Sequence, residues 1–236
     1  MTLLTGDDVT AVLLSLRVAL SATLGGLPIA LALAYLLARV RFPGRSVLDA
    51  LIHLPLVLPP VAVGFGLLLL LGRRGLVGAA LQSVGVVFAF RWTGAALAAG
   101  IMALPLMVRP IRQAIEAIEP EALEAAQTLG ASPLIRFVRI VIPLAAPGLI
   151  SAVVLGFARA LGEFGATITF VAAIPGETLT LPTAIYQATQ VPGAELRTLV
   201  LCAIAAAVAL AAILASEALS RRGPGPDLIP SDRNTL

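Results

Sequence analysis

Residues 18–38 read VALSATLGGLPIALALAYLLA, an apolar run of 21 positions without Asp, Glu, Lys or Arg. A helix needs about 20 mostly apolar residues to cross the hydrocarbon core of a bilayer. Backbone groups in hydrocarbon have no water to bond with, so they must pair within a helix or a closed barrel. This stretch therefore predicts a membrane-spanning helix.

Four more stretches without charged residues have similar lengths, namely residues 50–72 (23 positions), 92–108 (17), 140–158 (19) and 198–216 (19). Together the five predict an all-α, polytopic membrane protein with about five transmembrane helices. The cluster of Pro55, Pro59 and Pro60 predicts a kink in the second span. Residues 164–176 are expected to extend the fourth span, whereas the prolines and threonines of 178–194 suit a re-entrant or surface segment.

The composition excludes several classes of protein. Hydrophobic residues make up 59% of the 236 residues and charged residues 12%, and the mean hydropathy is +1.01, whereas soluble domains are about 45–50% apolar and 25% charged. All sixteen basic residues are arginines, and the chain has one histidine and one cysteine. These counts exclude a P-loop lysine, a His/Cys metal cluster and an internal disulfide. We expect neither a metal nor a cofactor, and the chain is not expected to be an enzyme.

The distribution of arginines predicts the orientation in the membrane, because cytoplasmic loops retain Lys and Arg. With five spans and the N-terminus outside, ten arginines are cytoplasmic (Arg39, Arg41, Arg45, Arg109, Arg112, Arg136, Arg139, Arg221, Arg222 and Arg233). Only Arg73, Arg74, Arg91 and Arg197 lie on the outer side. The same bias explains the net charge of +3 without a nucleic-acid partner. Residues 1–222 are predicted to form one transmembrane domain, and 223–236 a disordered C-terminal tail.

The longest polar segment, residues 109–139, reads RPIRQAIEAIEPEALEAAQTLGASPLIRFVR. Residues 121–129 favour a helix, Pro120 suits its first turn, and Gly130 suits the left-handed residue that ends it. A helix of about ten residues is not stable alone in water, so it must dock on something. Its partner is either the surface of its own transmembrane bundle or another chain.

A spaced motif begins within this helix. It consists of Glu124, Ala125 and Ala126, then Gly130 after three residues, and then the sequence from Ile140 to Pro143 after nine more. The pattern resembles the EAA loop of ABC importer permeases, in which EAA, three residues, Gly and nine residues precede I-x-L-P. Ile142 stands where the family has Leu. The resemblance places a coupling loop at about residues 116–143 and implies the type I ABC importer permease fold.

Residues 156–192, GFARALGEFGATITFVAAIPGETLTLPTAIYQATQVP, narrow the resemblance. They are similar to molybdate-importer permeases, which carry ARALGEFGAT, IPGET and LP-AIY elements in this region. Sulfate/thiosulfate permeases share parts of the pattern, so sulfate, thiosulfate and tungstate stay open as alternative substrates.

The resemblance implies a permease homodimer in the inner (cytoplasmic) membrane, two separate ATP-binding subunits, and an extracytoplasmic binding protein that delivers the oxyanion. The absence of a Walker A motif agrees with ATP hydrolysis by another chain. In this family the EAA helix is the coupling helix, and we assign that role to Glu124, Ala125, Ala126 and Gly130. Pro143 is expected to begin the fourth span.

The candidate translocation pathway includes Arg159, Glu163, Thr167 and Thr169. Arg159 and Glu163 are four residues apart, and ionisable residues inside a bilayer are functional candidates. The alternative is an internal structural ion pair. Thr167 and Thr169 are candidates for weak hydrogen-bond donors to the passing anion.

Two other classes of protein remain as alternatives. A membrane-embedded enzyme would need a convergent set of acid, base or metal ligands, and the intramembrane carboxylates are few and scattered. A membrane scaffold would explain a docking helix but not the Gly- and Thr-rich stretch at 162–169. Binding of an ATPase that depends on Glu124 and Gly130 would separate a permease from an enzyme.

Overall fold

The computed structural model describes residues 4–220, which contain helices and their connections but no strand. The predicted all-α class is therefore confirmed for this part of the chain. The helices in chain order are α1 (Gly6–Arg39), α2 (Arg45–Val57), α3 (Pro60–Leu71), α4 (Leu76–Ser83), α5 (Trp92–Glu116), α6 (Pro120–Thr128), α7 (Pro133–Arg136), a π-helical turn (Phe137–Val141), α8 (Ile142–Leu144), α9 (Ala146–Leu161), α10 (Gly165–Val171), α11 (Leu181–Thr189) and α12 (Glu195–Ser220).

Three of these helices, α1, α5 and α12, are each long and apolar enough to cross a membrane. Two bent pairs qualify as well if each pair counts as one span, which gives up to five spans. The first pair is α2 with α3, and the second joins Pro133–Leu144 to α9. The five stretches chosen by their lack of charge thus correspond to three continuous helices and two broken ones.

The second span is broken rather than kinked. Its two halves are α2 and α3, and the chain bends by 114° from the axis of one to the axis of the other. The break falls at Leu58 and Pro59, whose ψ angles of 143° and 130° are extended. A proline restricts the residue before it to extended conformations, so the adjacent pair Pro59 and Pro60 excludes helix over two consecutive residues. The predicted bend therefore lies at the proline cluster, but it interrupts the helix instead of kinking a continuous one.

The fourth span also differs from the prediction. Pro143 does not begin this span, because it lies within the helical stretch Pro133–Leu144. This stretch leads into α9 through a bend of 68° at Ala145. At its other end the span does not continue through residues 164–176: α9 ends at Leu161, and a separate helix, α10, begins at Gly165. Phe164 between them has φ −126° and ψ −57°, outside the helical region.

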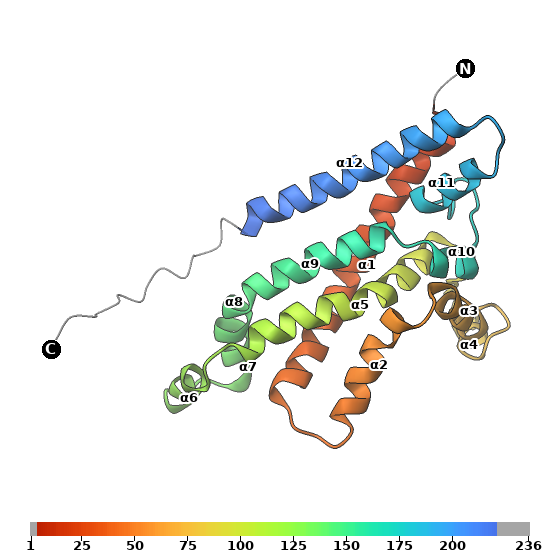
Figure 1. The fold of residues 1–236 in the computed structure, drawn as a ribbon. Coiled ribbons are helices and arrows are strands. Elements are labelled where there is room, and N and C mark those ends of the chain that lie inside the picture. Colours follow the sequence, from red (N-terminus) through yellow and green to blue (C-terminus); the bar gives the residue numbers. More distant parts are fainter. Residues whose placement is uncertain (1–3, 221–236) are drawn as a thin grey trace.

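The central helix of the bundle is α5, which packs against α1 on one side and α9 on the other. Figure 1 shows α5 and α9 running alongside each other, α1 crossing them at an angle, and α12 along α9. The buried positions of α5 are rich in small residues, among them Ala95, Ala99 and Ala103. Small side chains let helix backbones approach closely, which is the main source of helix packing in lipid. A second, smaller core joins α11 to α1 and α12.

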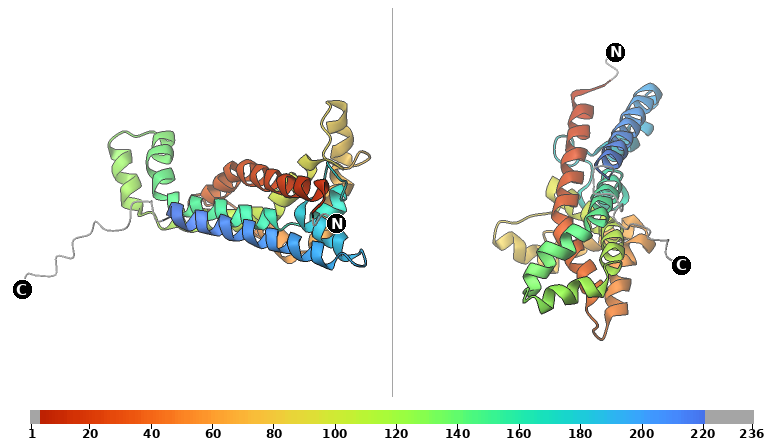
Figure 2. Two further views of the ribbon diagram at one scale, coloured as in Figure 1. Left: turned by 90° about the horizontal axis from the view of Figure 1, so that it is seen from above. Right: turned by 90° about the vertical axis from the view of Figure 1, so that its left-hand side faces the viewer.

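The short elements gather at the two ends of the bundle. Figure 2 shows α6 and α7 at one end, which we call the α6 end, and the start of α1 with α11 at the opposite end. The α10 helix packs against α3 near that opposite end (Figure 1). The predicted tail 223–236 and the arginines at 221, 222 and 233 lie outside the described residues.

Candidate functional site

The predicted coupling helix is present as α6, which spans Pro120–Thr128 and contains no buried residue. Glu124 and Ala125 are exposed and Ala126 is half-buried, while Leu129, at the end of the helix, is 88% exposed. A nine-residue helix has little stability of its own in water. Its exposed apolar and acidic side chains are therefore available to a partner chain.

Gly130 ends α6 in the way that the sequence predicts, since its φ is +80°. Its N–H donates to the Gln127 carbonyl at 2.9 Å, and the N–H of Ala131 donates to the Ala126 carbonyl at 3.0 Å. These two bonds form a Schellman motif, which requires a left-handed residue at the glycine position. The turn is closed further by Arg136, whose Nη1 donates to Gln127 Oε1 at 2.8 Å. Gly130 thus fixes the angle between α6 and α7.

Arg159 and Glu163, four residues apart, form an ion pair at the C-terminal end of α9. Arg159 Nη1 lies 2.6 Å from Glu163 Oε2, and the Glu163 side chain is only 2% exposed. The other carboxylate oxygen, Oε1, accepts a hydrogen bond from the Ala166 N–H at 2.8 Å. Glu163 therefore caps the first turn of α10, where a helix has free N–H groups and a positive dipole end. This capping explains why a new helix starts here.

The two threonines of the predicted pathway follow on α10. Thr167 is buried, and the Thr169 hydroxyl donates to the Gly165 carbonyl of its own helix at 2.8 Å. The structure thus brings the Arg159–Glu163 pair and both threonines into one short segment. Within this segment α10 packs against α3, so the break between α2 and α3 lies next to the connection between α9 and α10.

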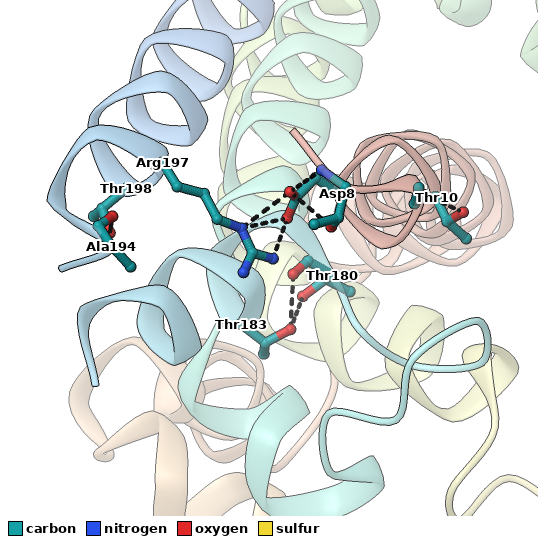
Figure 3. Close-up of polar contacts among 9 residues, drawn as sticks. Asp8, Thr10, Thr180, Thr183, Ala194, Arg197 and Thr198 are labelled. Carbon is teal, nitrogen blue, oxygen red and sulfur yellow. Dashed lines mark hydrogen bonds and ion pairs between the residues drawn. The ribbon is translucent and has the colours of Figure 1, made fainter. Parts of the chain in front are cut away.

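A buried ion pair at the opposite end of the bundle was not foreseen from the sequence. Asp8 is 1% exposed, and Arg197 donates to both of its carboxylate oxygens, from Nη2 at 2.6 Å and from Nε at 3.0 Å and 3.3 Å. Figure 3 shows this pair between the first turns of α1 and α12. The Thr5 N–H and hydroxyl also donate to Asp8, at 2.8 Å and 2.9 Å. The spacing Thr-x-x-Asp is a capping box, which was the available clue in the sequence.

Charged side chains also join α2 to the last turns of α5 at the α6 end. Arg112 Nη1 lies 3.2 Å from Asp49 Oδ2, and Arg112 Nε lies 2.8 Å from Glu116 Oε1. Arg45 is 3.8 Å from the same Glu116 oxygen. The side chains of this network are partly exposed, so each contact contributes little by itself. Together they attach the first half of the broken second span to the helix that leads into α6.

These features define a class: an all-helical, multi-span membrane subunit with a short exposed helix at one end and an ion pair where one of its spanning helices ends. Residues 26–222 match the family described as "Binding-protein-dependent transport system inner membrane component", and the chain belongs to this family. It is therefore an inner-membrane transport subunit and not an enzyme, and the ATPase of such a system is a separate subunit. The description of the family implies a binding protein as a partner, and the homologues imply ATPase subunits.

The chain is similar to the molybdenum transport system permease protein ModB of Escherichia coli (strain K12), with 51% identity over 220 residues that cover 93% of this chain and 96% of the relative. ModB of Haemophilus influenzae is 50% identical over 216 residues, 91% of this chain and 94% of the relative. A similar fold occurs in the crystal structure of a bacterial ABC transporter involved in the import of the acidic polysaccharide alginate. Its TM-score is 0.75 at 22% identity, over 93% of this chain and 80% of that one. The fold is thus that of an ABC importer permease.

Proposed function

We propose that this chain is the permease subunit of an ATP-driven importer of molybdate. The assignment of molybdate as the substrate rests on the 51% identity to the molybdenum permease of E. coli, which extends over nearly the full length of both chains. In the proposed complex, two copies of the chain form the pathway, two ATP-binding subunits bind below them, and an extracytoplasmic binding protein delivers the anion.

The proposed contact with the ATPase is α6 with its motif residues Glu124, Ala125 and Ala126. The helix is exposed at the end of the bundle, and the left-handed Gly130 gives it a fixed angle to α7. A rigid helix seated in a neighbouring subunit transmits a rigid-body motion when that subunit closes. ATP binding then switches the pathway between inward and outward access.

The α6 end is proposed to be cytoplasmic and both Asp8 and Arg197 to lie outside. The hydrogen bonds of Arg39 to Ile115 and Ile118 bring the 39–47 connection beside the 109–139 segment. The arginines of both loops therefore belong to one side of the membrane. The excess of arginine there favours the cytoplasmic side.

The experiment is co-purification and molybdate uptake with the ATPase subunits and the binding protein in proteoliposomes. Gly130→Pro removes the N–H that bonds Gln127, and proline cannot adopt a φ of +80°. This variant is expected to lose ATPase binding or uptake while still inserting into the membrane. Normal uptake by Gly130→Pro would contradict the assignment of α6 as the coupling helix.

A matched pair on α6 tests the motif itself. Glu124 and Glu121 are both exposed on the same helix, but only Glu124 belongs to the EAA motif. Glu124→Ala is expected to weaken ATPase binding, and Glu121→Ala to leave it close to wild type. Equal effects of the two substitutions would mean that α6 offers only its negative charge. ATPase binding without any molybdate uptake by the wild type would favour a scaffold.

A further inference from the structure

Arg39, the last residue of α1, holds the end of α5 just before the coupling helix begins. Its Nη2 donates to the Ile115 carbonyl at 2.7 Å and to the Ile118 carbonyl at 3.0 Å. Both isoleucines are buried. Glu119, the next residue after Ile118, is the N-cap of α6. One guanidinium nitrogen therefore donates hydrogen bonds both to the last turn of α5 and to the connection that leads into α6.

The position suits a cation for two physical reasons. The last carbonyls of a helix have no partner within the helix, and they carry the negative end of its dipole. Arg39 lies at two such ends at once, that of α5 and that of its own helix α1. Hydrogen bonds from a charged donor are roughly twice as strong as neutral ones. This contact is also partly shielded from water, unlike the exposed pair between Arg136 and Gln127.

Few other contacts fix the direction in which α6 leaves the bundle: Leu123 packs against the core, and the turn at Gly130 joins α6 to α7. No residue of α6 is buried, and only Ala117, Ile118 and Glu119 separate it from α5. Glu119 has ψ 132°, an extended conformation that turns the chain away from the axis of α5. The buried Ile118 side chain anchors the middle of this connection, and the Arg39 guanidinium adds the hydrogen bonds that join its carbonyl groups to α1. If this connection of residues 117–119 bent, a movement of α6 would not be transmitted to α5 and the rest of the bundle.

We propose that Arg39 is a positioning residue for the coupling helix. By holding Ile115 and Ile118 it makes this connection rigid, so that motion of α6 passes into α5 and α1 together. This role rests on the proposed function of α6 as the contact with the ATPase. Arg39 itself does not touch the ATPase or the anion.

The test uses the full-length permease in lipid nanodiscs, with a spin label on α6. Cys202 is the only cysteine of the chain and is exposed, so Cys202→Ser gives a cysteine-free background. Ala122→Cys then places the label on an exposed position of α6. Arg39→Met removes both hydrogen bonds, and Arg41→Met is the matched control, because Arg41 is exposed and forms no ion pair among the described residues.

Arg39→Met is expected to raise the mobile fraction of the label about tenfold, the lower end of what the loss of a hydrogen bond to a charged group produces. In the reconstituted complex with ATPase and binding protein, the number of molybdate ions imported per ATP hydrolysed is expected to fall several-fold. Arg41→Met is expected to match the wild type in both measurements. Arg39→Lys, which keeps the charge but not the planar donor group, is expected to lie between.

A label that is as immobile in Arg39→Met as in the wild type would overturn the positioning role, whether or not the complex transports. A mobile label together with wild-type transport would support the positioning role and contradict the role of α6 in coupling. If Arg39→Met does not accumulate in membranes, Arg39→Lys takes its place with the same two measurements. An unchanged label and an unchanged ratio of transport to hydrolysis in Arg39→Lys would then overturn the proposal.

Discussion

The contact between α3 and α10 predicts the effect of adding a single methyl group at Gly64. A Cβ atom at this position of α3 would lie 2.5 Å from the carbonyl oxygen and 2.8 Å from the Cα of Ala166 on α10. Both atoms belong to the backbone, so no side-chain rotation relieves the clash. Ordinary contacts begin at 3.4 Å, and Gly64→Ala would therefore have to move α3 and α10 apart by roughly 0.9 Å.

The magnitude follows from two opposing effects. Overpacking of a tightly packed contact costs about 1–3 kcal/mol, whereas replacing a glycine by alanine inside a helix gains about 1 kcal/mol in helix propensity. Gly66 lies two residues further along α3, and its Cβ would meet no atom within 4 Å. Gly66→Ala therefore has the propensity gain alone. We expect Gly64→Ala to lower the free energy of unfolding by about 2 kcal/mol relative to Gly66→Ala.

The assay is unfolding of the purified permease in mixed micelles by increasing SDS, followed by the fluorescence of Trp92, the only tryptophan. Trp92 lies at the start of α5 and stacks against the Arg17 guanidinium, 3.8 Å from the ring centre, so its emission reports on the packed bundle. Equal unfolding free energies for Gly64→Ala and Gly66→Ala would refute the close packing of α3 on α10.

Three further predictions concern charged residues. Asp8→Ala leaves Arg197 without its buried partner and is expected to destabilise the permease by about 2 kcal/mol, less than for a fully buried pair because Arg197 is partly exposed; an unchanged SDS midpoint would contradict this. Glu163→Gln keeps an oxygen acceptor but leaves Arg159 unpaired, so uptake is expected to fall at least several-fold at normal membrane levels; wild-type uptake would exclude a role for the charge pair. Asp7→Cys in the cysteine-free background is expected to react with an impermeant maleimide from outside intact cells, and labelling only after lysis would reverse the topology.

The spans could be predicted from the sequence because partition into lipid depends on local composition and length. The breaks were predicted less well. A single proline inside a span has no fixed outcome, and the adjacent pair at 59 and 60, which restricts two consecutive residues to extended conformations, was expected only to kink the helix. Pro28 and Pro105 lie inside continuous helices, whereas the pair at 59 and 60 separates α2 from α3. The end of α9 depends on Glu163, whose carboxylate caps the next helix, and nothing in the apolar pattern of residues 164–173 indicates that bond.

The helix α6 and its glycine cap were predictable for the same reason, since both are set by residues within one short segment. The contacts that hold the bundle together were not. Arg39 reaches carbonyl groups 76 and 79 residues away, and Arg197 reaches a carboxylate 189 residues away. The sequence indicated on which side of the membrane each charge lies, but only the packed fold shows which charges meet.

The proposed function of this chain is to form the pathway of a molybdate importer driven by a separate ATPase. Its most direct test is the ATPase activity of the reconstituted complex, measured with the binding protein loaded in turn with molybdate, tungstate and sulfate. Stimulation by the molybdate- or tungstate-loaded protein, and not by the sulfate-loaded one, is the predicted result. Stimulation by sulfate alone would contradict the substrate, and no stimulation by any of the three would contradict coupled transport itself.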